Sequence, residues 1–124
     1  MFTFDYPVYI YKLECTKTGR VYIGKTCNPE KRHKQHLFRL KARKHVIEEM
    51  QTDFDKYGES SFVFTVLETV NRKPVDGKAH YTDAEREKQT MLEYRSYLPE
   101  FGYNYKDRYF YLTRNGVTRC LVGD

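Results

Sequence analysis

The sequence predicts an α+β fold, in which a three-stranded antiparallel sheet is flanked by three helices. Residues 8–26 have the pattern of a β-hairpin, residues 62–69 alternate like a third strand, and three segments carry helix signals. The element order ββααβα, followed by a C-terminal hairpin, favours antiparallel pairing. At 124 residues the chain is expected to form one domain, 1–124, with the extra hairpin at 105–124.

The first element is a hairpin that turns at "TKTG". Residues 8–13 alternate in polarity and residues 21–23 are a Val/Tyr/Ile run, both typical of strands. Alternation puts Tyr9 and Tyr11 on one face, and a connecting loop of two or four residues puts Tyr22 on that face too. Two phenols would then be neighbours. The plainer interpretation is that tyrosine is a good strand residue, and this chain contains 12 of them.

Two helices are expected after the hairpin. Asn28 as N-cap and Pro29 at the first helical position open the first one, which should run to about Ala42. The second helix ends at Gly58 as its C-cap. Its apolar positions at helical spacing are Ile47, Met50, Phe54 and Tyr57.

The rest of the chain is expected to add one strand, one helix and one hairpin. Residues 62–69 predict a mostly buried strand. Thr82 and Glu85 form a capping box for a third helix, which should end near Leu98–Pro99. The C-terminal hairpin should turn at 115–116, an Asn-Gly pair.

The net charge of +5 comes from one segment. Residues 31–45 hold seven Lys or Arg and three His, with no acid. A single-sign run repels itself and favours an anionic partner, of which a phosphate backbone is the commonest; a solvated helix face is the alternative. The candidate nucleic-acid contacts are Lys25, Lys31, Lys34, Arg39, Lys41, Arg43, Lys44 and His45.

Glu87 falls within the apolar stripe of the third predicted helix. A carboxylate facing a core is costly unless it is paired or binds a metal. Spacing alone leaves three possibilities open: a metal ligand, one half of a salt bridge, or a residue at the edge of the stripe that reaches water. The stripe itself consists of Ala84, Met91, Tyr94 and Leu98.

Arg32 and His36 are four residues apart on the first predicted helix and therefore share a face. Together they could direct a guanidinium and an imidazole at one phosphate. On spacing alone, membership of a solvated basic helix is the simpler interpretation.

The sequence favours a cytoplasmic protein with no membrane partner. No apolar run reaches the ~20 residues of a membrane span, and the N-terminus lacks the pattern of a secretion signal. Cys15, Cys27 and Cys120 are an odd number without metal-site spacing, which suits a reducing compartment.

Taken together, these residues resemble the GIY-YIG nuclease family, above all the catalytic domains of phage-type homing endonucleases. The second half of the family motif is "YIG" at 22–24 and the first half is "YIY" at 9–11, with ten residues between Tyr11 and Tyr22. The resemblance covers residues 8–104. Further matching positions are Arg32, His36, His45, the segment 54–68, Glu87 and the "GYN" that ends at Asn104.

There are two departures from the family pattern. Tyr9 stands where the first motif has a glycine, which affects local packing rather than the chemistry assigned to the tyrosine. Phage-type members often carry a separate DNA-binding region after the catalytic domain, whereas about twenty residues follow Asn104 here. Sequence specificity from such a region is therefore not expected.

The resemblance implies a metal-dependent endonuclease that hydrolyses phosphodiester bonds in DNA. By analogy, Tyr11 is the general base, and a phenol with an ordinary pKa near ~10 must be tuned by nearby positive charge from arginine, lysine, histidine or a metal. Glu87 would bind one divalent ion, Mg²⁺ or Mn²⁺. The other catalytic candidates are Tyr22 beside the base, Arg32 on the scissile phosphate, His36, and Asn104 as a supporting hydrogen-bond partner.

The same resemblance sets the expected partners. They are DNA and a metal ion without a small-molecule cofactor, for a monomer or weak homodimer in a phage-infected or bacterial host cell. The main alternative is a non-catalytic nucleic-acid-binding module that uses the basic helix 31–45. A protein-interaction role for a tyrosine-rich surface is a third possibility.

Overall fold

The structure, a computed structural model, describes residues 7–71 and 83–104. Within these ranges no helix is long and apolar enough to cross a membrane. The C-terminal hairpin at 105–124 and the Thr82 part of the capping box lie outside the described residues, so both stay predictions. The elements in chain order are β1 (Pro7–Cys15), β2 (Val21–Thr26), α1 (Pro29–Lys41), α2 (Glu48–Tyr57), a one-turn 3₁₀ helix (Glu59–Ser61), β3 (Phe62–Asn71) and α3 (Asp83–Tyr94).

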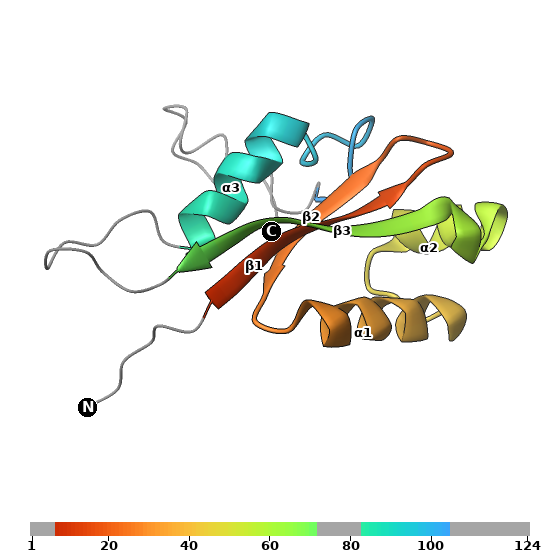
Figure 1. Cartoon of the computed structure of the whole chain (residues 1–124). Coiled ribbons are helices and arrows are strands. Elements are labelled where there is room, and N and C mark those ends of the chain that lie inside the picture. Colours follow the sequence, from red (N-terminus) through yellow and green to blue (C-terminus); the bar gives the residue numbers. More distant parts are fainter. Residues whose placement is uncertain (1–6, 72–82, 105–124) are drawn as a thin grey trace, which may run out of the picture.

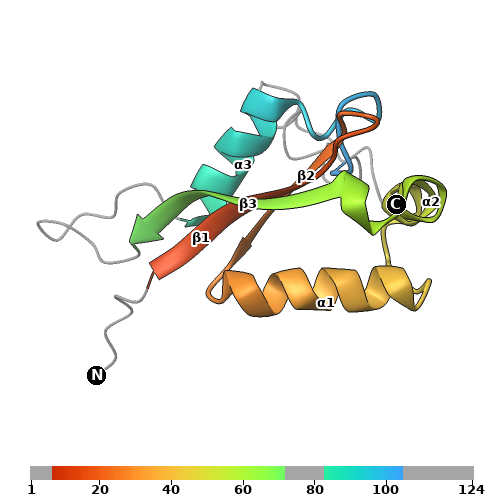
Figure 2. The ribbon, with the colours of Figure 1, turned by 45° about the vertical axis from the view of Figure 1, so that its right-hand side comes forward.

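The sheet is antiparallel, with the strand order β2-β1-β3, and it lies between two layers of helices. Figure 1 shows α3 on one face and α1 with α2 on the other, and the turned view in Figure 2 agrees. The predicted α+β fold of three strands and three helices is confirmed. Leu13 of β1 belongs to the apolar core on the α1/α2 side, and Ile10 belongs to the core under α3.

The hairpin has the predicted geometry. The N–H of Cys15 donates to the carbonyl oxygen of Arg20 at 2.9 Å, which closes a four-residue loop. Tyr11 is therefore opposite Gly24, and Leu13 is opposite Tyr22. Tyr11 and Tyr22 lie diagonally on the α1 face, with their ring centroids 6.2 Å apart.

Both helices on that face begin and end close to the predicted residues. The side chain of Asn28 accepts a hydrogen bond from the backbone N–H of Lys31 at 3.1 Å, which caps α1. The C-cap of α1 is Ala42. At the end of α2, Gly58 has φ +86°, a backbone conformation that glycine adopts without steric cost.

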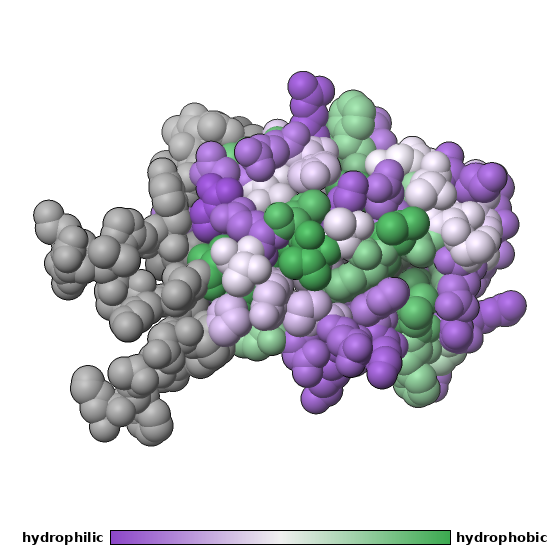
Figure 3. Space-filling view, in the orientation of Figure 1, coloured by the Kyte–Doolittle hydropathy of each residue, from purple (hydrophilic) through white to green (hydrophobic). Residues whose placement is uncertain are grey.

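The expectation that the third strand is mostly buried is wrong. Among residues 62–70, only Phe62 and Val70 are buried in the apolar core, whereas Val63 is 45% exposed and Val66 43% exposed. The reason is that α3 packs mainly over β2 and much less over β3, although both are edge strands of the sheet. Figure 3 shows hydrophobic residues in the middle band, where β3 runs in Figure 1.

The helix α3 ends at Tyr94, four residues before the predicted end. Arg95 takes the left-handed conformation with φ +56°, and the N–H of Ser96 bonds the carbonyl oxygen of Met91 at 3.1 Å. A left-handed residue followed by a hydrogen bond of this kind can end a helix even when the residue is not glycine. The predicted inward stripe also shifts, because Tyr94 is exposed and has the Lys12 ammonium 5.5 Å from its ring centroid. The buried residues of α3 are Asp83, Thr90 and Met91.

Candidate active site

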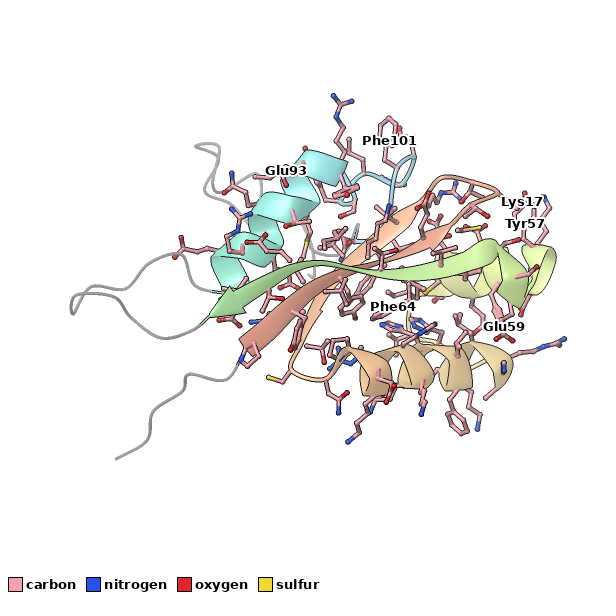
Figure 4. The ribbon with its side chains drawn as sticks, viewed as in Figure 1. Lys17, Tyr57, Glu59, Phe64, Glu93 and Phe101 are labelled. Carbon is pink, nitrogen blue, oxygen red and sulfur yellow. The ribbon has the colours of Figure 1, made fainter. Side chains whose placement is uncertain are left out.

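Tyr11 lies at the centre of the sheet and is completely buried. Its ring crosses β2 at Gly24, where a Cβ atom would come within 2.5 Å of the Tyr11 hydroxyl oxygen. On another side its ring stacks on Phe64 of β3, with centroids 4.7 Å apart. Phe64 points from β3 toward α1 (Figure 4), where it also stacks on His33. Because Gly24 has no side chain, the Tyr11 ring can occupy the space beside it. This role of Gly24 becomes apparent only from its pairing with Tyr11 in the sheet.

Two buried histidines continue from the Tyr11 hydroxyl. The Tyr11 Oη and His36 Nε2 atoms are 2.9 Å apart, and His36 Nδ1 is 2.9 Å from His45 Nε2. The backbone N–H of Ile47 donates to His45 Nδ1 at 3.1 Å. His45 was expected to contact nucleic acid, but its side chain is buried against His36 and cannot reach a phosphate backbone. That assignment is corrected: the segment between α1 and α2 folds His45 inward.

Burial dominates the ionisation of this chain of groups. It lowers the pKa of His36 to about 3, helped by the nearby His45 and Arg32, and lowers the pKa of His45 to about 4, so both rings are neutral at neutral pH. Burial raises the pKa of Tyr11 to about 12, while a hydrogen bond and positive charge from Arg32 lower it and the Glu87 charge raises it. The expected positive charge near the phenol thus comes from Arg32 and not from the histidines.

A cleft of about 240 Å³ lies where β1 and α3 begin, β2 ends and α1 starts. Arg32 lines it and is close enough to Tyr11 to lower the pKa of the phenol, which places the cleft near Tyr11. Lys25 Nζ is 2.9 Å from Asp83 Oδ2 across the cleft. Asp83 was not singled out in the sequence, although its position four residues before Glu87 on one helix is a detectable signal. The lining residues are Val8, Lys25, Thr26, Cys27, Arg32 and Asp83.

Glu87 is half-buried on α3, and its charge acts on Tyr11. Over residues 7–71 and 83–104, no group of three or more His, Cys, Asp or Glu side chains is arranged to hold a metal ion. Mg²⁺, however, is often bound by one or two carboxylates together with waters and substrate phosphates. Glu87 is one helical turn after the cleft residue Asp83, and a single carboxylate whose charge acts on Tyr11 fits that second kind of site and not an all-protein metal cage.

Tyr22 belongs to β2, and Asn104 bonds the backbone of the same strand. The Asn104 amide oxygen accepts from the Ile23 N–H at 2.8 Å, and its amide nitrogen donates to the Ile23 carbonyl at 3.1 Å. Asn104 thereby supports the strand that carries Tyr22 and Gly24. The Tyr22 ring lies edge-on to His36, with centroids 5.6 Å apart. The structure thus brings Tyr11, Tyr22, Arg32 and His36 together, with Glu87 acting on Tyr11 and Asn104 behind β2.

A second hollow, of about 420 Å³, lies on the outer surface of α1. In its lining, Phe38 is 73% exposed among cationic side chains. Of the other predicted contacts, Lys41 pairs with Glu59 at 3.1 Å, and Arg43 and Lys44 are exposed. The residues around this hollow are Lys31, Lys34, Gln35, Phe38 and Arg39, which we call the α1 groove.

Known proteins share both the sequence pattern and the fold. Residues 7–104 match the family described as the GIY-YIG catalytic domain. A mutant form of the catalytic domain of the intron endonuclease I-TevI is 28% identical, covers 82% of this chain and 95% of its own, and has a TM-score of 0.64. The catalytic domain of the homing endonuclease I-TevI is 27% identical, covers 77% and 95%, and has a TM-score of 0.60. A comparison with curated proteins gave no match.

Proposed function

Because this chain belongs to the GIY-YIG catalytic domain family, we propose that it hydrolyses phosphodiester bonds in DNA with Tyr11 as the general base. Membership of the family supports an endonuclease function in general. The observation that carries the finer proposal is the buried Tyr11 hydroxyl, which contacts His36 and has its pKa lowered by Arg32, a residue that lines a cationic cleft. A phenol is an uncommon base, and its burial next to a guanidinium is hard to explain by packing alone.

The cationic residues of the cleft would bind the phosphate of the substrate. Arg32 presents a planar set of N–H donors that matches phosphate oxygens, and Lys25 adds a second positive charge that is held by Asp83. A phosphate drawn to Arg32 would lie near the Tyr11 hydroxyl, since Arg32 is close enough to lower the pKa of that group. The arrangement therefore favours positioning a phosphodiester within reach of the base.

The chemical step is a proton transfer coupled to in-line attack. The deprotonated Tyr11 oxygen takes a proton from a water molecule, whose oxygen forms a bond to phosphorus while the bond to the leaving oxygen breaks. The leaving oxygen then takes a proton from solvent. With a pKa of about 12, a small fraction of Tyr11 is deprotonated at neutral pH, and the positive charge of Arg32 stabilises that form.

Glu87 is the residue that would hold the metal ion. GIY-YIG nucleases generally use a divalent metal. Mg²⁺ or Mn²⁺ held there would supply positive charge to the phosphate as negative charge develops on it. Without such charge, the Glu87 carboxylate raises the pKa of Tyr11 and opposes its action as a base.

The α1 groove is the proposed contact for the DNA backbone. Lys31, Lys34 and Arg39 line it, and all three are exposed. Phosphate contacts of this kind provide affinity without base recognition. The groove and the cleft share the helix α1, so a duplex on the groove is oriented by the same element that carries Arg32.

The test is cleavage of supercoiled plasmid with and without Mg²⁺, followed on a gel. We expect Mg²⁺-dependent nicking or linearisation by the wild type and its loss in Glu87→Ala with DNA binding retained. Tyr11→Phe should lower the rate by ~10²–10⁴-fold, the usual contribution of a general base. Tyr9→Phe is the matched control, because it removes a hydroxyl from the same face of β1 and should leave the rate nearly unchanged.

Two results would contradict the proposal. DNA binding without cleavage in either Mg²⁺ or Mn²⁺ would favour the non-catalytic binding module. A larger loss in Tyr9→Phe than in Tyr11→Phe would show that the base has been assigned to the wrong tyrosine.

A further inference from the structure

We propose that the backbone N–H of Ile47 locks His45 and His36 in one tautomer, so that His36 Nε2–H donates a hydrogen bond to the Tyr11 oxygen. His45 is then a positioning residue that acts through His36. The functional meaning of this lock rests on the proposed role of Tyr11 as the base. The hydrogen-bond direction itself can be measured without any cleavage.

The first step concerns His45. A backbone amide can only donate, so His45 Nδ1, 3.1 Å from the Ile47 nitrogen, must accept and carries no proton. A neutral imidazole has one N–H, which on His45 must therefore be at Nε2. Burial keeps His45 neutral by lowering its pKa to about 4.

The second step applies the same reasoning to the hydrogen bond between His45 and His36. His45 Nε2–H faces His36 Nδ1 at 2.9 Å, so His36 Nδ1 accepts. The single proton of neutral His36 is then at Nε2, which lies 2.9 Å from Tyr11 Oη. Three hydrogen bonds in succession thus point from the start of α2 to the phenol.

Hydrogen bonds in the opposite direction are disfavoured at Ile47. If Tyr11 donated to His36 Nε2, His36 would carry its proton on Nδ1 and His45 would carry its own on Nδ1. The Nδ1–H of His45 would then face the N–H of Ile47 in a buried position, with the two nitrogen atoms 3.1 Å apart. Two donors without an acceptor are disfavoured there, because each loses its hydrogen bond to water and gains none.

The chemical consequence is that His36 is a donor to Tyr11 and not its base. His36 Nε2 already carries a proton and cannot take another from the phenol without becoming charged, which burial opposes by lowering its pKa to about 3. The His36 N–H and the nearby positive charge of Arg32 both stabilise the deprotonated oxygen. The Tyr11 proton must therefore leave toward the cleft.

The decisive measurement is the tautomer of each histidine by ¹⁵N NMR on the full chain, with His36→Gln and His45→Gln used for assignment. We expect both rings to be neutral with the proton on Nε2 from about pH 5 to pH 8. Tyr11→Phe should leave both tautomers unchanged, because the direction comes from Ile47 and not from the phenol. A proton on Nδ1 of either ring, or a mixed state, would overturn the proposal.

Two variants of His45 then test positioning. His45→Leu removes the donor to His36, so the His36 tautomer should become mixed and single-turnover cleavage should fall by about 10-fold or more. His45→Gln keeps an amide N–H that can reach His36 Nδ1, and it should restore both the tautomer and most of the rate. An unchanged His36 tautomer in His45→Leu would refute the lock.

The two proposals fail in different experiments. If the wild-type chain cuts no DNA but shows the expected tautomers, the proposed function is wrong and the lock stands. If His45→Leu does not fold, the wild-type and Tyr11→Phe spectra still decide the direction.

Discussion

Replacing Gly24 by alanine should impair cleavage by moving the Tyr11 hydroxyl. A Cβ at this position would lie 2.5 Å from Tyr11 Oη and 2.6 Å from Cζ. Ordinary contacts begin near 3.4 Å, so the ring must shift by about 1 Å. The ring is completely buried and stacks on Phe64, so it has little freedom to move without losing the 2.9 Å contact with His36.

The shift should affect both stability and rate. Overpacking of a buried site typically costs ~1–3 kcal/mol of unfolding free energy. A misplacement of about 1 Å at a reacting group can cost ~10²-fold in rate. We expect Gly24→Ala to show both losses, in urea unfolding and in single-turnover cleavage of a labelled duplex. Combining it with Tyr11→Phe should add little further loss of rate, because the two changes act on the same hydroxyl.

Gly19→Ala is the matched control. Gly19 is in the turn of the same hairpin with φ +80°, and no atom lies within 4 Å of the place where its Cβ would be. Alanine there should cost ~1–2 kcal/mol through backbone strain alone and leave the rate per folded molecule unchanged. Cleavage by Gly24→Ala within about threefold of wild type would refute the argument that this glycine makes room for the base.

Three further predictions concern ionisation, salt and stability. In the proposed mechanism Tyr11 acts deprotonated, and its pKa is about 12, so cleavage should rise about tenfold per pH unit from about pH 6 to pH 9; a single-turnover plateau within that range would exclude a base with this pKa. Replacing Lys31 and Lys34 by alanine should reduce the log–log salt slope of duplex binding by up to ~0.9 each; fluorescence anisotropy that shows an unchanged slope would place the DNA elsewhere. Tyr103→Phe removes a 2.6 Å hydrogen bond to the buried Asp53 and should lower the unfolding free energy by ~1–3 kcal/mol without changing the rate per folded molecule; urea unfolding equal to wild type would contradict this.

The sequence by itself determined the elements whose signals are local. Asn28 and Pro29 start α1, and Gly58 ends α2, because capping bonds and backbone freedom depend on neighbours within one helical turn. The shared face of Tyr11 and Tyr22 followed from the strand period of two and a four-residue loop. These features need no knowledge of distant residues.

The sequence was less informative where an element meets a distant part of the chain. The pattern of β3 resembles that of a buried strand, yet its burial depends on which helix packs over it, and α3 packs mainly over β2. The end of α3 was missed because Arg95 adopts a left-handed conformation without the glycine that usually marks it.

The candidate site shows the same division. Arg32, His36 and Glu87 were identified by residue type and spacing, together with the resemblance to a nuclease family. Tertiary structure decided that His45 is buried against His36 instead of facing DNA, and that Asp83 holds Lys25 at the cleft. Spacing along a helix shows which residues share a face, but what that face meets depends on strands and helices tens of residues away. Burial, pKa and hydrogen-bond direction arise from those encounters, so only the folded chain determines them.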